Sequence, residues 1–79
     1  MDGKYLVVRT FWSYQGAQSN SQEAKDSFEL AKKRAYTILG SDIASETIAK
    51  EIVTILNPNG LQVFLEVIDN RTPEPEAEE

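Results

Sequence analysis

The sequence predicts a small α+β protein with the order strand, helix, helix, strand. We expect an antiparallel pair of strands with an αα-hairpin packed on one face, completed into a four-stranded sheet or a sandwich by dimerisation. Three observations support this prediction: aromatic and β-branched residues near the start, two apolar patterns at helical spacing, and a return to strict alternation. A chain of 79 residues holds one domain, which we assign to residues 1–70. Residues 71–79 are expected to be a disordered acidic tail, because proline and glutamate dominate them.

The first strand is predicted over residues 4–14. One side of it would carry Leu6, Val8, Thr10, Trp12 and Tyr14, and the other Tyr5, Val7, Arg9, Phe11 and Ser13. Neither side is cleanly polar, although a sheet with one solvated face should alternate more sharply. The pattern therefore leaves open which side of this strand is buried.

The first helix is predicted to begin near Ser19–Ser21, where serine and asparagine could cap its free N–H groups. Its apolar stripe would consist of Ala24, Phe28, Ala31, Ala35, Ile38 and Leu39. Gly40 is a typical residue to end it.

A second helix is predicted from Ser41 or Ser45 to Leu56, with Ile48, Ile52 and Ile55 on its buried stripe. Its β-branched residues favour a strand, but Glu51 and its polar neighbours interrupt strict alternation, so we prefer a helix. The stretch Asn57–Gly60 contains turn-forming residues and should reverse the chain.

The last strand is predicted over residues 61–69. Leu61, Val63, Leu65 and Val67 alternate there and are expected to face the helices. The order strand, helix, helix, strand is loosely shared by many small bacterial and phage proteins, an analogy that carries no function.

A homodimer is predicted because the strands offer more apolar side chains than one helical layer can cover. Two strands alone are marginally stable, and monomers rarely expose large apolar patches. The expected partner or dimer interface consists of Tyr5, Val7, Phe11, Phe64 and Ile68. The leading functional hypothesis is therefore a small, non-catalytic interaction or accessory protein that acts as a homodimer and could bind another protein.

Nucleic-acid binding is the first alternative. Its weak candidate contacts are Arg9, Lys25, Lys32, Lys33 and Arg34, beside strand aromatic residues on which bases could stack. The net charge of -5 argues against it. A small-ligand carrier or an enzyme subunit is a further alternative.

Several classes of chemistry are excluded by composition. The chain has no histidine and no cysteine, which removes zinc sites built on these residues, catalytic triads and disulfides. No glycine-rich phosphate loop occurs. We expect no enzyme activity, no cofactor and no membrane segment. A cytoplasmic location is expected, because the sequence shows no signal peptide and no long apolar run.

Overall fold

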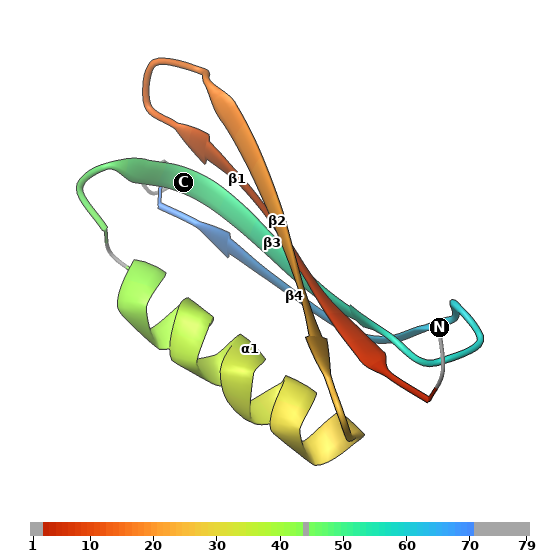
Figure 1. Cartoon of the computed structure of the whole chain (residues 1–79). Helices are drawn as coiled ribbons and strands as arrows, with labels where there is room; N and C mark the ends of the chain where they lie inside the picture. The colour runs from red at the N-terminus through yellow and green to blue at the C-terminus, as the bar shows by residue number, and fades with distance from the viewer. Residues whose placement is uncertain (1–2, 44, 71–79) are drawn as a thin grey trace, which may run out of the picture.

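Four strands and one helix make up the part of the chain that the structure describes, residues 3–43 and 45–70 of a computed structural model. The elements are β1 (Tyr5–Ser13), β2 (Gln18–Lys25), α1 (Phe28–Asp42), β3 (Ile48–Leu56) and β4 (Gln62–Asp69). The strands form one sheet in the order β2-β1-β3-β4, with every neighbouring pair antiparallel. Helix α1 lies against one face of this sheet (Figure 1).

The predicted α+β class agrees with this architecture, but the predicted αα-hairpin is wrong. Only one helix occurs among the described residues, and the segment assigned to the second helix is strand β3. A single chain supplies all four strands, so the sheet does not need a second copy to complete it. Residues 71–79, predicted as an acidic tail, lie outside the described residues.

Strand β2 occupies residues where the sequence predicted a loop and the start of a helix. It pairs with β1 along its whole length, from Gln18 opposite Trp12 to Lys25 opposite Tyr5. Most of β2 is exposed, and an edge strand exposed in this way needs few apolar side chains. The serine-rich capping signal was therefore a local preference that pairing with β1 outweighed.

Helix α1 begins six to eight residues later than the sequence suggested, directly after the N-cap residue Ser27. The Ser27 hydroxyl oxygen accepts a hydrogen bond of 3.2 Å from the backbone N–H of Leu30, which is a standard N-cap. The helix continues past Gly40 to Asp42, because Gly40 has no positive φ there and does not act as a stop.

Strand β3 shows why a helical pattern can mislead. Its buried side chains do alternate, at Ala49, Glu51, Val53 and Ile55. The alternation was hidden because a charged residue occupies one buried position and Ile52 adds an apolar side chain on the opposite side. Strand β3 is central in the sheet, because its two edges are hydrogen-bonded to β1 and β4, and α1 covers only the face that carries Val53 and Ile55.

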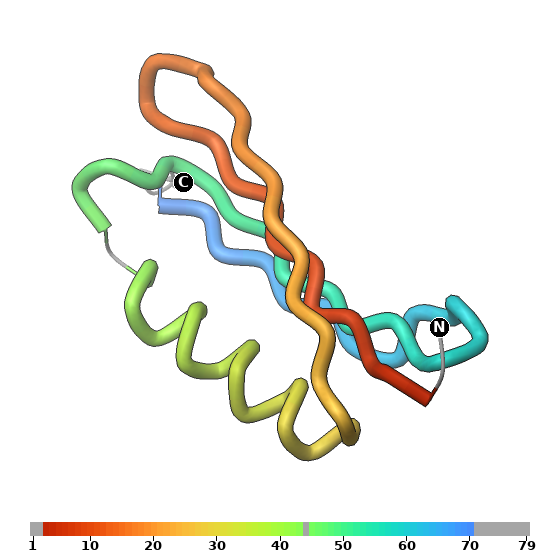
Figure 2. The backbone as a smooth tube through the Cα atoms, in the orientation of Figure 1, coloured from red at the N-terminus to blue at the C-terminus, as the bar shows by residue number. Residues whose placement is uncertain are grey.

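The turn at Asn57–Gly60 is confirmed, although it joins two strands instead of a helix and a strand. The Gly60 N–H donates to the Asn57 carbonyl at 2.8 Å, and the Asn57 N–H donates to the Leu61 carbonyl at 2.8 Å. Gly60 has a φ of 85°, a conformation that glycine adopts without strain. The reversal makes β3 and β4 a hairpin (Figure 2).

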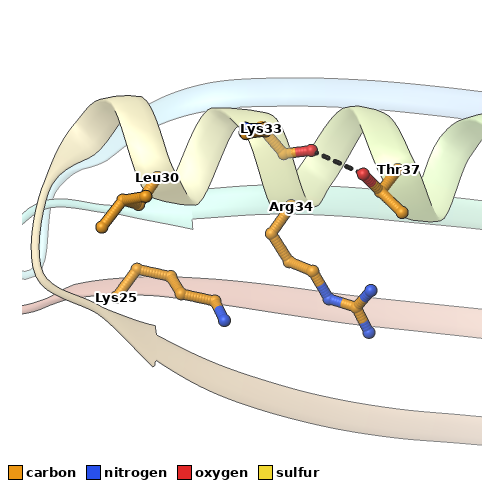
Figure 3. A pocket seen from close by; sticks show the side chains of 5 residues that line it. All are labelled: Lys25, Leu30, Lys33, Arg34 and Thr37. Atoms are coloured by element: carbon orange, nitrogen blue, oxygen red, sulfur yellow. Dashed lines mark hydrogen bonds between the residues drawn. The ribbon is translucent and has the colours of Figure 1, made fainter.

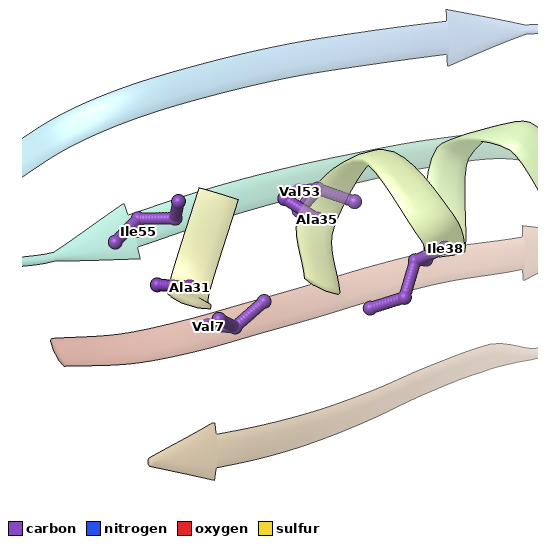
Figure 4. Close-up of a cluster of buried hydrophobic side chains, with 6 residues drawn as sticks. All are labelled: Val7, Ala31, Ala35, Ile38, Val53 and Ile55. Carbon is purple, nitrogen blue, oxygen red and sulfur yellow. The ribbon is translucent and has the colours of Figure 1, made fainter. Parts of the chain in front are cut away.

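The hydrophobic core lies between α1 and the two central strands. Its members are Val7, Ala31, Ala35, Ile38, Val53 and Ile55 (Figure 4). Tyr5, Phe28, Leu39 and Phe64 pack around them. Ala31 and Ala35 of the helix face the sheet and are fully buried, and side chains this small let the helix lie close to the strands.

The orientation predicted for the last strand is reversed. Val63, Leu65 and Val67 are 43%, 50% and 50% exposed. Phe64 packs against the core instead, and its ring meets the Tyr36 ring edge-on with centroids 5.6 Å apart. Ile52, expected on a buried stripe, is only partly buried.

Candidate functional site

The sheet face opposite α1 is a candidate interaction surface. Side chains alternate along a strand, so every second residue points away from the helix. On this open face lie Leu6, Val8, Thr10 and Trp12 of β1, Ile52, Thr54 and Leu56 of β3, and Leu65 and Val67 of β4. No helix or strand among residues 3–43 and 45–70 covers these side chains (Figures 1 and 2). We call them the open face.

Strand pairing arranges the open face in rows. Val8 pairs with Thr54, which pairs with Leu65, and Thr10 pairs with Ile52, which pairs with Val67. These two rows form a continuous block of aliphatic and methyl-bearing side chains in the middle of the sheet.

Charge on the open face is confined to one end. Trp12 pairs with Lys50, which pairs with Asp69, and the Lys50 ammonium lies 5.7 Å from the centre of the Trp12 ring. Toward β2 the same face becomes polar, with Gln18, Asn20 and Gln22 opposite β1. The apolar block therefore has a polar margin, as protein interfaces commonly do.

The interface residues predicted from the sequence lie on the other face, which α1 covers. Val7 is 1% exposed within the core, and Tyr5 and Phe64 pack against that core. Phe11 follows the same alternation, and the Arg9 guanidinium lies 4.2 Å from the centre of its ring. Ile68 lines a hollow beside Tyr36. The surplus apolar surface exists, but it belongs to the alternate residues of the same strands.

A buried ionic cluster ties the sheet to the end of the helix. Arg9 of β1 forms ion pairs with Glu51 of β3 and with Asp42 at the end of α1, the latter at 2.6 Å. The Glu51 side chain is fully buried, and its Oε1 atom has no hydrogen-bond partner among the described atoms. One guanidinium therefore serves two carboxylates and leaves one buried oxygen unsatisfied.

Burial raises the pKa of Glu51 to about 7, with the neighbouring Asp42 carboxylate acting in the same direction and Arg9 opposing it. The cluster can therefore hold a proton near neutral pH. It offers no nucleophile, and no group of three potential metal ligands occurs among the described residues. Its evident role is to fix the position of α1 on the sheet.

Three of the five predicted nucleic-acid contacts come together at one groove. Lys25 of β2 and Lys33 and Arg34 of α1 line it, together with Leu30 and Thr37 (Figure 3). Arg9 is engaged in the buried cluster, and the Lys32 ammonium lies over the Phe28 ring at 5.3 Å, outside this groove. The five predicted contacts therefore do not form one basic surface, because Arg9 and Lys32 lie apart from the three residues of the groove.

Sequence reasoning missed the Arg9–Glu51–Asp42 cluster. The sequence did contain a signal for it, because Arg9 and Glu51 are charged residues within otherwise apolar stretches. If these stretches are strands, both side chains lie among buried residues and need a charged partner. Reading Glu51 as a solvent-exposed helical residue removed that signal.

Comparisons with known proteins add no assignment: no protein-family model, curated protein or solved structure matches the chain. Within the described residues, no helix has the length and apolar character required to cross a membrane. The cytoplasmic location remains a prediction.

Proposed function

We propose that this chain is a small non-catalytic interaction protein that acts as a homodimer through its open face. The observation that carries the proposal is the contiguous apolar block on a sheet face that no described element covers. Large exposed apolar patches on monomers are uncommon and mark interaction sites. A second copy is the simplest partner, because a two-fold axis pairs the block with an identical one.

The size of the open face suits such an interface. Four strands of about eight residues have a footprint of about 500 Å², from a strand spacing of about 4.8 Å and a rise of about 3.3 Å per residue. The accessible area of a face ridged by side chains exceeds its footprint, and a standard interface buries about 800 Å² on each partner. Stacking two open faces therefore gives an interface of this order.

A face-to-face sandwich accounts for the residues better than pairing of sheet edges. Edge pairing would leave Val8, Ile52 and Leu65 in water, whereas stacking buries all three. Lys50 and Asp69 lie at one end of the sheet, where their charged groups can stay at the solvated rim of a stacked dimer while the neighbouring Trp12 ring packs inward.

Trp12 provides a direct test, because it is the only tryptophan in the chain and lies on the open face. We expect sedimentation equilibrium at micromolar concentration to give twice the chain mass. Dilution should shift the Trp12 emission to longer wavelength over the same concentration range in which the mass falls. A monomer at all concentrations, with emission that does not change on dilution, would contradict the proposal.

Nucleic-acid binding keeps one supporting observation, the convergence of Lys25, Lys33 and Arg34 at one groove. The aromatic residues do not support it, because Phe11 lies on the covered face and Trp12 on the opposite one. A fluorescence titration with single- and double-stranded oligonucleotides at low salt tests this alternative. Binding that weakens steeply with salt would favour it.

A further inference from the structure

A groove runs along the side of α1 that faces β2. The proposed dimer does not use it, because it lies on the helix side of the sheet. Two hollows of about 330 and 130 Å³ share Arg34 and Thr37, so they form one continuous groove, with Leu30 at one end and Ser41 at the other. These four residues recur at a spacing of three or four, which places them on one side of the helix over a length of about 16 Å.

Strand β2 lies beside this groove and is not covered by the helix in its middle part. Its pairing with β1 places Ser19, Ser21, Glu23 and Lys25 on the helix side of the sheet. Ser19 and Ser21 are nevertheless exposed, whereas Glu23 and Lys25 are partly buried. The small serine side chains leave room beside the helix.

The end of the groove near Lys25 is positively charged. The side chains of Lys25 and Arg34 extend over the strands beside α1 (Figure 3). Both hold the Glu23 carboxylate: the Arg34 Nε donates to it at 2.9 Å, and the Lys25 ammonium lies 3.2 Å from its Oε1 atom. Lys33 lines the same hollow, and its ammonium forms no ion pair within residues 3–43 and 45–70. Three cations against one carboxylate leave a net positive charge, and the contacts of Glu23 show that the groove can hold a carboxylate.

The outer edge of β2 adds backbone groups that a ligand could bind. Strand β2 is the first in the order β2-β1-β3-β4, so within the described part of the chain only β1 pairs with it. Its other edge therefore presents N–H and C=O groups with which an extended peptide can pair, as in strand addition. Every second side chain of such an added strand would point to the helix side, toward Lys25, Lys33 and Arg34.

The lining of the groove suits a peptide better than a nucleic acid. Leu30 is 49% exposed and offers an apolar contact at the charged end. None of the described residues that line the two hollows is aromatic, so the groove lacks rings on which unpaired bases could stack. We propose that the groove binds an extended acidic segment of a partner protein as a strand added along β2, with carboxylates at alternate positions held by Lys25, Lys33 and Arg34.

Synthetic peptides titrated into the full-length, isotope-labelled protein test this proposal. The probe is a capped peptide of the length of β2, 8 residues, in which glutamate alternates with threonine. We expect saturable binding that shifts the amide signals of β2 and α1 and leaves those of the turn at 57–60 unchanged. The same peptide with glutamine in place of glutamate should bind at least about tenfold more weakly. Salt of about 1 M, where the Debye length is about 3 Å, should weaken the glutamate peptide in the same way.

Backbone methylation of the peptide tests strand addition separately from charge. In an extended strand the N–H groups of alternate residues point to the same edge, and only one edge of an added strand faces β2. One probe is methylated at the glutamate amides and the other at the threonine amides, and both keep the full charge. One of the two should lose binding and the other should retain it.

Matched protein variants locate the charge. Lys33→Glu should weaken binding of the glutamate peptide at least about tenfold. Lys32→Glu is the same change one residue away, at a side chain that lies over the Phe28 ring and outside the groove, and should have little effect. Glu23→Gln removes the carboxylate that already occupies Lys25 and Arg34 and should tighten binding.

Equal binding of the glutamate and glutamine peptides would overturn the proposal, and so would signal shifts confined to the open face. Equal binding of the two methylated peptides would show that no strand is added. Tighter binding of a single-stranded oligonucleotide of the same charge, which the peptide fails to displace, would assign the groove to nucleic acid instead. The peptide comparisons need no substitution in the protein, and none of these outcomes depends on whether the open face forms a dimer.

Discussion

The two faces of the sheet contain similar apolar residues, but those of one face are buried and several of those on the other are exposed. On the covered face, Val7, Val53 and Ile55 are 1%, 0% and 0% exposed. On the open face, Leu65 and Val67 are each 50% exposed, although they belong to the same sheet. The difference is the helix, which contacts only one side (Figure 1). Side-chain chemistry alone therefore does not decide which face becomes the core of this protein.

The two faces also differ in whether their charged groups are buried. The covered face holds Glu51 fully buried with one unsatisfied oxygen, whereas the charges of the open face lie in its end row. An unsatisfied buried polar group costs about 1–3 kcal/mol, and more when charged. The better-packed face therefore carries the larger electrostatic cost.

The largest expected effect compares two isoleucines of β3, one on each face. Ile55→Ala should lower the free energy of unfolding by about 2–5 kcal/mol, because it opens a cavity in the core. Ile52→Ala should cost much less at protein concentrations that favour the monomer, since Ile52 is only partly buried. Urea denaturation of both variants measures the difference. Equal losses at high dilution would show that the open face is already covered within one chain.

The next effect is a pH dependence from Glu51. Its pKa is raised in the folded chain, so folding favours the protonated form, and stability should fall as pH rises from about 5 through about 7. The loss should be on the order of 3 kcal/mol. Glu51→Gln keeps the shape without the charge, so it should remove this decline and be more stable than wild type at pH 8. Thermal unfolding at several pH values gives the comparison, and the same decline in the variant would place its origin elsewhere.

A smaller effect is expected from a charge placed on the open face, and it concerns the dimer dissociation constant. Val67→Lys should raise the dimer dissociation constant at least about tenfold, or roughly 1.4 kcal/mol, because the charge would be buried in both copies. Leu61→Lys introduces the same charge at an exposed residue just before β4 and should leave dimerisation unchanged. Sedimentation equilibrium distinguishes the two, and equal weakening by both would point to a general charge effect.

The smallest effect is expected on the stability of helix α1, which covers one face of the sheet and leaves the other open. Ser27→Ala removes the N-cap hydrogen bond to Leu30 and should cost about 1 kcal/mol. Hydrogen exchange should show faster opening of α1, while the pairing of β3 with β4 retains its protection. Equal acceleration in β3 and α1 would mean that the sheet does not persist when the helix loosens.

The sequence predicted several elements for sound physical reasons. The first strand, the last strand and the turn at Asn57–Gly60 rest on alternation and turn chemistry, which act locally. The middle of the helix was also predicted, since Ala31, Ala35 and Ile38 recur at helical spacing and are buried. The charged groove residues Lys25, Lys33 and Arg34 were named, but not their common location.

The sequence by itself determined an α+β protein without cysteine or histidine chemistry, an excess of apolar strand residues and the position of the reversal at 57–60. Only the tertiary structure decided that β2 and β3 are strands and that one helix covers Val7 and Ile55 instead of Val8 and Ile52. The physical reason is that β2 is held by hydrogen bonds to β1, and β3 by hydrogen bonds to β1 and β4 at its two edges. Both effects join residues far apart in the chain, and a local pattern does not contain them.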